Sequence, residues 1–406
     1  MIRLLGDLWA IDPRRSQINV SFAGLGEADL YFANLETPIY ADQANCRAKA
    51  GPHIKGKFET LVSVCDPGER YCLALANNHM MDFEEIGLNA TLEACQLLGA
   101  KTFGAGVNIQ AAQSPIILEY DTMRIGILAR CETQFGVAEP DKPGVAALDP
   151  TVYDQLRKLK AVTDVVIISV HGGAEMCPWP SPRRQATFRS FVDAGADIVH
   201  GHHSHIPQGY EIYNESLICY GLGNFLVDPK AWQEIPNSRW SIVIDFDPFS
   251  KTSSITSASI DEDNGTIAVT ARPHNSHPER QSYIEKCNAP LKNRKMLTAV
   301  WQEVSIRMYQ GYYADWLGFS KRQTSPHQYA RSKLKRLRRL VRRSTTWSVD
   351  PKTYQLLLRY HLFACESHSE AIATALGVLG GELEDVRTPE LSALVDTLMP
   401  SSQGGP

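Results

Sequence analysis

The chain has 406 residues, of which 43% are hydrophobic and 21% charged, and its formal net charge is −4. These proportions are typical of globular proteins and exclude collagen-like, coiled-coil and wholly disordered chains. Because no global excess of basic charge is present, we expect no nucleic-acid partner. A chain of this length is expected to form two or three domains.

The cysteines and the apolar runs indicate the compartment. The nine cysteines are scattered and form no Cys-x-x-Cys pair, so we expect small, mostly buried side chains in a reducing environment. The opening residues lack the pattern of a cleaved leader, and no apolar run approaches the roughly 18–20 residues that cross a bilayer. We therefore expect a cytoplasmic protein.

Short apolar runs alternate with helical stretches up to about residue 227. The predicted strands are 1–6, 29–34, 71–76, 124–129, 164–170, 197–199 and 216–221, and plausible helices lie at 84–98, 152–160 and 183–193. Near-continuous apolar strands separated by helices are typical of a largely parallel sheet covered on both faces. The pattern predicts an α/β domain.

The following section changes character. Residues 240–246 alternate as a strand, and an antiparallel hairpin of 255–260 and 266–271 is predicted around Asp263-Asn264-Gly265. We place the first domain at 1–275 and expect a linker at 271–280. A second, helical region is predicted at 280–400. Its apolar residues recur at three- and four-residue spacing in 283–317, 326–343 and 351–379.

Metal-competent side chains follow five of the predicted strands. They are Asp7, Glu36, Asn78, His79, His171, Glu175, His202, His203 and His205. Because the carboxyl ends of parallel strands meet at one edge, we expect these groups in one cleft. Imidazole and carboxylate ligands suit manganese, iron or zinc. One or two such ions, about 3.5–4 Å apart when paired, perform hydrolysis, with an unligated histidine as acid or base.

Each motif alone has a simpler explanation. An Asp or an Asn-His after a strand is often a turn or a helix cap, and Glu36 could pair with a nearby base. Four histidines within six residues, His200, His202, His203 and His205, are harder to explain in this way. The coincidence of five polar strand ends therefore favours a metal site.

An ordered set of motifs resembles the CapA family. The set is GD (6–7), NLE (34–36), NNHxxD (77–82), HGGAE (171–175), GHHSH (201–205) and GLGNFLVD (221–228). The resemblance covers about residues 1–248. It implies a calcineurin-like metallophosphoesterase fold, with a layered α/β domain, and a link to poly-γ-glutamate capsule synthesis.

The resemblance also implies roles for individual residues. The implied metal ligands are Asp7, Glu36, Asn78, His171, His203 and His205, with Glu36 as the bridging ligand. His79 is implied as a general acid or electrophile, and Glu175 would orient water or a substrate amine. The adjacent His202 could take the place of His203 as a metal ligand. Asn224 and Asp228 belong to the closing motif without an assigned chemical role.

Two positions depart from the family pattern. The GD motif continues as Leu8-Trp9-Ala10-Ile11, where a small, glycine-containing turn is usual, which would alter access to the first metal position. Ser204 stands where the histidine motif usually has proline, which would loosen that turn.

Two basic segments have alternative explanations. Arg47, Lys49, Lys55 and Lys57 follow the Glu36 turn, and Lys55 and Lys57 are our candidates for substrate binding; a solvated loop is the alternative. Segment 331–343 holds eight basic residues among thirteen. It is either a surface helix packed on the domain or a basic amphipathic helix that contacts anionic lipid, an acidic polymer or a synthase complex.

The sequence therefore favours a metal-dependent hydrolase. Its substrate would be a phosphorylated small molecule or an amide of an acidic, glutamate-like polymer. The alternative is a non-catalytic scaffold that keeps the metal site for structure or docking. A third hypothesis is a membrane-peripheral partner recruited through 331–343.

Overall fold

Two β-sheets packed against each other form the α/β part of the chain. The computed structural model describes residues 1–9, 19–39, 46–65, 68, 70–319 and 350–399. The first sheet has nine strands in the order β2 (Asn19–Ala23), β17 (Thr266–Pro273), β16 (Thr252–Asp263), β15 (Trp240–Asp247), β1 (Ile2–Leu8), β3 (Leu30–Leu35), β4 (Tyr71–Ala74) and β5 (Lys101–Phe103), with β14 (Asn224–Leu226) paired to β1.

The second sheet has six strands. Their order is β12 (Tyr210–Tyr213), β13 (Ser216–Cys219), β11 (Ile198–His202), β10 (Val165–His171), β8 (Met123–Cys131) and β7 (Ile116–Tyr120). A small pair, β6 (Ala105–Gly106) and β9 (Gly144–Val145), lies apart from both sheets. β1 contacts β11 and β5 contacts β8, and one apolar core includes strands of both sheets.

The central strands of both sheets are parallel. β1, β3, β4 and β5 pair in parallel, as do β8, β10, β11 and β13, while β15, β16 and β17 are antiparallel. Every residue of β10 is buried, which explains its continuous apolar sequence. The predicted α/β class, with a largely parallel sheet and an antiparallel hairpin, is confirmed. The division of these strands between two sheets was not anticipated, because strand periodicity does not identify pairing partners.

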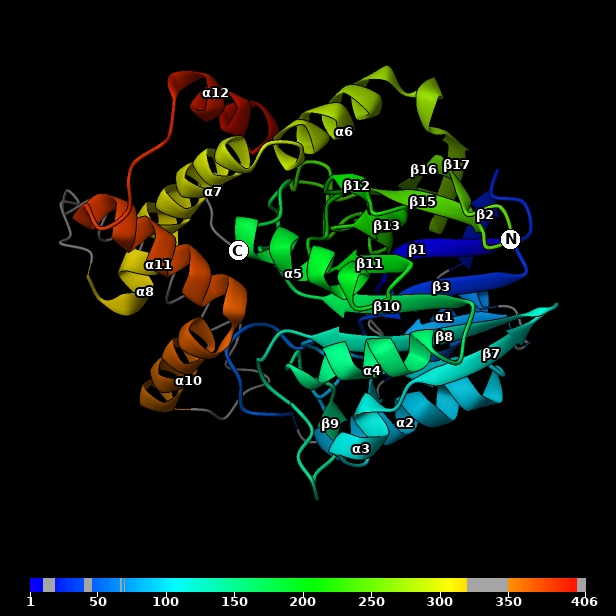
Figure 1. The fold of residues 1–406 in the computed structure, drawn as a ribbon. Coiled ribbons are helices and arrows are strands. Elements are labelled where there is room, and N and C mark those ends of the chain that lie inside the picture. The colour runs from blue at the N-terminus through cyan, green and yellow to red at the C-terminus, as the bar shows by residue number, and fades with distance from the viewer. Residues whose placement is uncertain (10–18, 40–45, 66–67, 69, 320–349, 400–406) are drawn as a thin grey trace.

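Helices cover these sheets. They are α1 (Phe58–Val64), α2 (Glu84–Leu97), α3 (Ile109–Gln113), α4 (Thr151–Lys160) and α5 (Pro182–Asp193). α4 contacts β10, and α5 contacts β11 and β13; both lie in front of the second sheet in Figure 1. α5 begins at Ser181, whose side chain accepts a hydrogen bond from Arg184 N, followed by a proline in the first turn.

The linker predicted at 271–280 is wrong in its extent. β17 continues to Pro273, a 3₁₀ turn, η1, follows at His274–Ser276, and α6 (Pro278–Leu291) begins within the predicted linker. Pro278 suits the first turn of this helix, where no backbone N–H is needed.

The helical region is divided more often than its apolar spacing predicts. It contains α6, α7 (Arg294–Met308), a π-helical segment η2 (Tyr309–Tyr313), α8 (Ala314–Leu317), α10 (Pro351–Ala364), α11 (Glu366–Gly380) and α12 (Pro389–Leu398). The Asn293 side chain caps α7 by accepting a hydrogen bond from Met296 N at 3.2 Å, which separates it from α6. Segments 326–343 and 331–343 lie outside the described residues.

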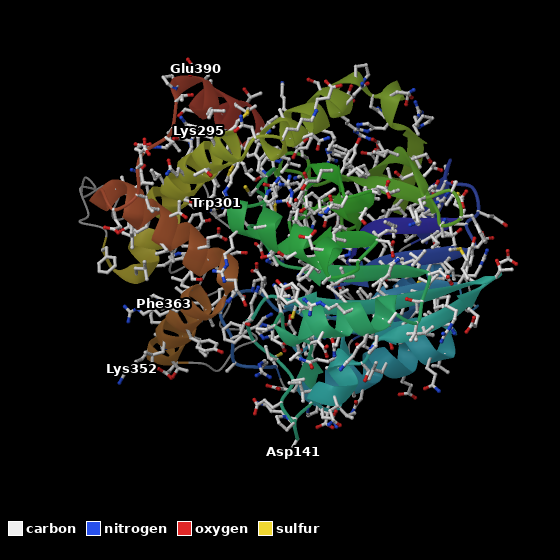
Figure 2. The ribbon with its side chains drawn as sticks, viewed as in Figure 1. Asp141, Lys295, Trp301, Lys352, Phe363 and Glu390 are labelled. Atoms are coloured by element: carbon white, nitrogen blue, oxygen red, sulfur yellow. The ribbon has the colours of Figure 1, made fainter. Side chains whose placement is uncertain are left out.

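The helical region is joined to the α/β part by buried polar contacts as well as apolar ones. Tyr283 Oη donates to Pro207 O at 2.8 Å, and Gln185 Nε2 donates to Leu291 O at 2.8 Å. α10 and α11 stand at the left of Figure 1. Phe363 on α10 is 68% exposed and lies at the outer side of the molecule in Figure 2.

The cysteines were expected to be mostly buried, and no segment was expected to cross a membrane. All nine cysteines are free; eight are buried and Cys46 is exposed. Among the described residues, no helix combines the length and the apolarity needed to cross a membrane.

Candidate metal centre

Asp7 is placed by close contact between β1 and its neighbours. β1 pairs with β14 and β3 so that Asp7 lies beside Asn224 and Asn34. A Cβ atom on the preceding Gly6 would overlap the Gly223 carbonyl oxygen, so the Gly-Asp pair requires glycine here. Asp7 Oδ1 accepts a hydrogen bond from Asn34 Nδ2 at 2.9 Å, and Asp7 Oδ2 accepts one from His203 N at 3.3 Å.

The Asp7 side chain is buried among imidazoles. His202 Nδ1 lies 3.0 Å from Asp7 Oδ1 without the alignment of a hydrogen bond, and His205 Nδ1 lies 4.0 Å from Oδ2. Burial would raise the pKa of Asp7, but His202, His205 and Asn34 outweigh burial and lower it. Asp7 is therefore an ionised carboxylate at neutral pH.

Glu36 is the unusual carboxylate of the cleft. It follows β3 and is fully buried, and neither carboxylate oxygen has a hydrogen-bond partner among the described residues. His205 Nε2 and His171 Nε2 lie 3.6 and 3.7 Å from Oε1. Burial, with the negative charges of Asp7 and Glu175, raises the pKa of Glu36 well above its ordinary value.

Glu36, His203 and His205 could hold a metal ion. One ligand atom from each of the three buried side chains lies within 4.8 Å of the others. His203 and His205 both have left-handed backbone, with φ of 84° and 57°, which is uncommon for residues other than glycine and clusters at functional sites. Between them, Ser204 Oγ donates to Ile206 O at 2.7 Å, so a side-chain hydrogen bond stabilises the turn where the family usually has proline.

His171 also lies close to Glu36, and Asn78 contacts His171. His171 Nε2 is 2.9 Å from Asn78 Oδ1, and His171 Nδ1 is 3.2 Å from Asn34 Nδ2. Asn34 therefore joins His171 to Asp7. Burial, followed by the charges of His203 and other imidazoles, lowers the pKa of His171 well below its ordinary value, so its ring is neutral and able to bind metal.

His79 is oriented by a buried ion pair. Its Nδ1 lies 2.9 Å from Asp82 Oδ2 and 3.2 Å from Lys49 Nζ, while Lys49 also forms an ion pair with Asp82. The shorter contact to Asp82 assigns the proton to Nδ1, which leaves Nε2 as an acceptor. Burial, then the charge of Lys49, lowers the pKa of His79 to about 4.

The remaining predicted residues surround this group. Glu175 Oε1 lies 3.6 Å from His203 Nε2, and Asn224 Oδ1 lies 3.1 Å from His205 Nδ1. His200 packs beneath the motif with Nε2 2.8 Å from Leu5 O. The half-buried Lys55 and Lys57 lie just before α1, and their role in substrate binding stays a prediction.

Several residues of the site were not nominated from the sequence. Asn34 and Asp82 lie within the NLE and NNHxxD motifs, so the motifs contained them without indicating their contacts. Trp9 forms a wall: its ring lies 5.8 Å from His79 and 5.7 Å from His205, centroid to centroid, and packs edge-on against Trp232. The departure from the family's small turn after Gly-Asp thus places an indole directly beside the cleft.

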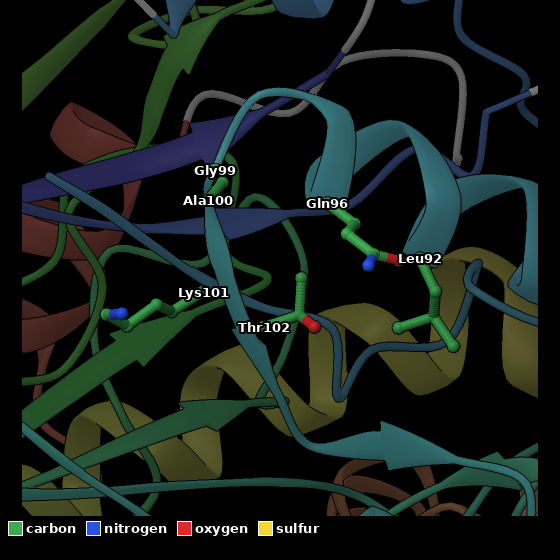
Figure 3. A pocket seen from close by; sticks show the side chains of 6 residues that line it. All are labelled: Leu92, Gln96, Gly99, Ala100, Lys101 and Thr102. Carbon is green, nitrogen blue, oxygen red and sulfur yellow. The ribbon is translucent and has the colours of Figure 1, made fainter. Parts of the chain in front are cut away.

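A pocket of about 400 Å³ lies elsewhere, at the end of α2 and the beginning of β5 (Figure 3). Its lining residues are Leu92, Gln96, Gly99, Ala100, Lys101 and Thr102. Parallel sheets bind ligands where their strands end, whereas Lys101 begins its strand. The pocket also lacks any metal-competent side chain, so we place the chemistry in the buried cleft.

A layered α/β fold with carboxylates and imidazoles at its strand ends defines a calcineurin-like protein of the metallophosphoesterase type. Residues 19–229 match the family model described as "Bacterial capsule synthesis protein PGA_cap". The chain therefore belongs to this family, which confirms the resemblance to CapA.

Curated relatives carry related names. The chain is 31% identical over 223 residues to "Capsule biosynthesis protein CapA" of Bacillus anthracis, covering 53% of this chain and 54% of that protein. It is 29% identical to "PGA biosynthesis protein CapA" of Bacillus subtilis, covering 52% and 56%. A third relative, at 32% identity over 49% of this chain and 56% of its own length, is "Probable polyglutamine synthesis accessory protein Rv0574c" of Mycobacterium tuberculosis. The matched region spans about half the length of each relative.

A hypothetical protein from Thermus thermophilus is a weak structural match. Its crystal structure has 13% sequence identity and a TM-score of 0.34, over 67% of this chain and 97% of that one.

Proposed function

We propose that this protein is a metal-dependent hydrolase that acts on an anionic substrate in capsule or poly-γ-glutamate synthesis. The proposal rests above all on Glu36. A buried carboxylate normally has hydrogen-bond partners, because an unpaired one is costly. Glu36 has none, although imidazoles of His171 and His205 lie within 4 Å of it. A cation between these groups would satisfy the carboxylate.

The donor set fits one or two divalent ions. Glu36, His203 and His205 would form one ligand group, and His171, Asn78 and Asp7 would supply the ligands for a second ion. Imidazole, carboxylate and amide donors suit manganese, iron or zinc. When bound, such ions supply Lewis acidity and make water nucleophilic at neutral pH.

The protein's own groups would handle protons and orientation. Asp82 fixes the orientation of the His79 ring. The neutral Nε2 of His79 would first accept a proton, and the protonated ring could then act as the general acid. Lys49 keeps positive charge beside this ring. Glu175, 35% exposed and close to His203, is placed to orient water or a substrate amine.

The substrate class comes from charge and from the relatives' names. Lys49, Lys55 and Lys57 lie on the loop that follows Glu36 and suit phosphate or carboxylate groups. Since the relatives' names refer to capsule, PGA and polyglutamine synthesis, we propose a phosphoester or a γ-glutamyl amide as the bond cleaved. A cytoplasmic location stays a prediction.

The second candidate is a non-catalytic accessory subunit that uses the metal site for docking. The word "accessory" in the mycobacterial relative's name favours it. Recruitment to a membrane or synthase through 331–343 is a separate proposal. Co-sedimentation with anionic vesicles, with and without that segment, tests the membrane form: unchanged binding after its removal would contradict recruitment.

Metal content tests the hydrolase. Protein reconstituted with manganese, iron or zinc is measured for metal per chain and for hydrolysis of p-nitrophenyl phosphate and γ-glutamyl-p-nitroanilide. We expect one or two ions per chain in the wild type, with metal and turnover lost together in His203→Ala. The matched control is His277→Ala, outside the cleft. Metal without turnover would favour the accessory role, and no metal in the wild type would contradict both.

A further inference from the structure

The start of α11 is fixed to the α/β part at a buried carboxylate. Glu132, which follows β8, accepts hydrogen bonds from Ser367 Oγ, Ser367 N at 3.4 Å and Cys365 Sγ at 3.2 Å. It also pairs with Arg184 and accepts a hydrogen bond from Gly173 N at 3.1 Å. Gly173 lies two residues after His171, so this junction lies beside the metal cleft.

Further hydrogen bonds hold the same helix. Thr133 N and Oγ1 donate to the two carboxylate oxygens of Glu366 at 2.8 and 2.9 Å, and Ser181 Oγ donates to Glu370 at 2.7 Å. Anionic groups near the first turn of a helix interact favourably with its dipole. The position of α11 over the α/β part is therefore specified by several independent contacts.

This docking places a chain of hydrogen-bonded rings at the cleft. His368 Nδ1 lies 2.6 Å from Tyr313 Oη, and His368 Nε2 lies 2.9 Å from His361 Nε2. The His361 ring stacks on Phe135, with centroids 5.6 Å apart and planes at 4°. The chain of hydrogen bonds ends at His361 Nδ1, which is buried and has no hydrogen-bond partner in the part of the protein that the structure describes.

The His361 ring lies next to the NNHxxD motif of the metal cleft. It stacks on Phe135, and the following residue, Gly136, packs so closely against Met81 that an added Cβ would lie 2.4 Å from the Met81 Cβ. Burial, followed by the charges of His205, His79 and His368, lowers the pKa of His203 well below its ordinary value. The pKa of His361 falls to about 3 through burial, then through the charges of His368, Lys49 and His79. His361 is therefore a neutral ring at neutral pH.

The hydrogen-bond chain allows two proton arrangements. When the Tyr313 hydroxyl donates to His368, and His368 Nε2 donates to His361 Nε2, the His361 proton is on Nδ1 and has no acceptor. In the reverse arrangement Nδ1 is an unpaired acceptor. An anionic oxygen, which accepts hydrogen bonds and donates none, fits the first arrangement.

We propose that His361, held by His368 and Tyr313, binds an anionic oxygen, from a carboxylate or a phosphate, of the substrate that reacts at the metal centre. The helical region thus completes the substrate site of the α/β domain. This inference rests on the proposed hydrolase for its substrate, but anion binding can be measured without turnover.

The test is calorimetric titration of full-length protein, metal-free and manganese-loaded, with inorganic phosphate and with γ-glutamylglutamate. His361→Phe keeps the aromatic stack and removes both nitrogens, and we expect binding weakened by roughly tenfold or more. Tyr313→Phe removes the hydroxyl that sets the proton arrangement, so a smaller loss of a few fold is expected. Which probe loses affinity distinguishes phosphate from carboxylate.

The controls separate this role from a structural one. Tyr360→Phe, on the same helix as His361 but 52% exposed, is expected to bind as the wild type does. Metal content and melting temperature should be unchanged in His361→Phe; if this variant fails to fold, His361→Gln replaces it. The proposal is overturned by wild-type affinity in the His361 variants, by loss of metal from them, or by a wild type that binds neither probe. Anion binding that depends on His361, without any turnover, would support the inference while contradicting the hydrolase.

Discussion

Two buried carboxylates, each directly after a parallel strand, have opposite surroundings. Glu132 follows β8 and is bonded to Arg184, Gly173, Cys365 and Ser367. Glu36 follows β3, and within the described segments neither of its oxygens has a hydrogen-bond partner. Both side chains are at most 3% exposed.

The difference separates a structural carboxylate from a candidate metal ligand. Protein groups satisfy Glu132, and it joins the helical region to the α/β domain. Glu36 faces imidazole rings, which can donate a hydrogen bond to it only when the nitrogen that faces it carries a proton. The pKa of His171 is lowered, so this ring is neutral and carries only one proton for its two nitrogens. The number of hydrogen-bond partners, rather than burial, therefore predicts which carboxylate binds a cation.

Glu132→Gln should produce the largest loss of stability. It leaves the buried Arg184 guanidinium without its carboxylate, which costs about 3–5 kcal/mol. Chemical denaturation checks this value. The control is Glu119→Gln, which removes an exposed ion pair with Arg124 and should cost less than about 1 kcal/mol. Equal losses in both variants would contradict the structural role of Glu132.

Gly6→Ala should be the next most destabilising change. The new Cβ would overlap the Gly223 carbonyl oxygen and force β14 away from β1, at a cost of about 3 kcal/mol. Metal affinity should fall as well, since this pairing positions Asp7. Gly311→Ala is the matched control: its Cβ would meet no atom within 4 Å, and it should change the unfolding free energy by less than about 1 kcal/mol.

Glu36→Gln should have the opposite sign to Glu132→Gln in metal-free protein. The pKa of Glu36 is raised in the fold, so the native state holds its proton longer than the unfolded chain does. The free energy of unfolding of the metal-free wild type therefore falls as pH rises above 4.5, the ordinary pKa of a glutamate side chain. Removing the charge should stabilise the metal-free protein at pH 8 by about 1–3 kcal/mol and abolish stabilisation by metal. A destabilised metal-free variant would show that Glu36 has a structural partner.

The smallest effect concerns His200. Burial lowers its pKa well below 6.5, so the unfolded chain takes up a proton that the fold does not. The contribution of neutral His200 to the free energy of unfolding is present above pH 6.5 and is lost as pH falls. His200→Gln keeps a donor for Leu5 O and should flatten the decline of melting temperature between pH 6.5 and 5. An unchanged slope would assign the decline to the other buried histidines, such as His171 and His203.

Much of the site was predictable because its signals are local. Asp7, Glu36 and Asn78 lie at or after the ends of strands in the first sheet, and His171 ends a strand of the second. Strand periodicity predicted these polar strand ends, whereas their meeting depends on how the two sheets pack. The contacts of Asn34 and Asp82 were not predictable, although both residues lie inside the motifs. A motif identifies residue types, whereas a hydrogen bond between segments depends on the register of their strands.

The points at which the helical region divides into separate helices could not be predicted from the spacing of its apolar residues either. Asn293 ends a continuous pattern because its side chain caps the next helix. α11 begins after Cys365, where Ser367 binds Glu132, 235 residues away in the sequence.

The sequence by itself determined the α/β class, the order of the polar strand ends and the residue types offered to a metal, because each depends on neighbours within one strand or turn. Only the tertiary structure decided that the strands form two sheets, that among the described residues Glu36 is unpartnered whereas Glu132 is satisfied, and that the start of α11 meets Glu132. Burial and hydrogen-bond satisfaction depend on which distant segments meet, and local patterns do not encode those meetings.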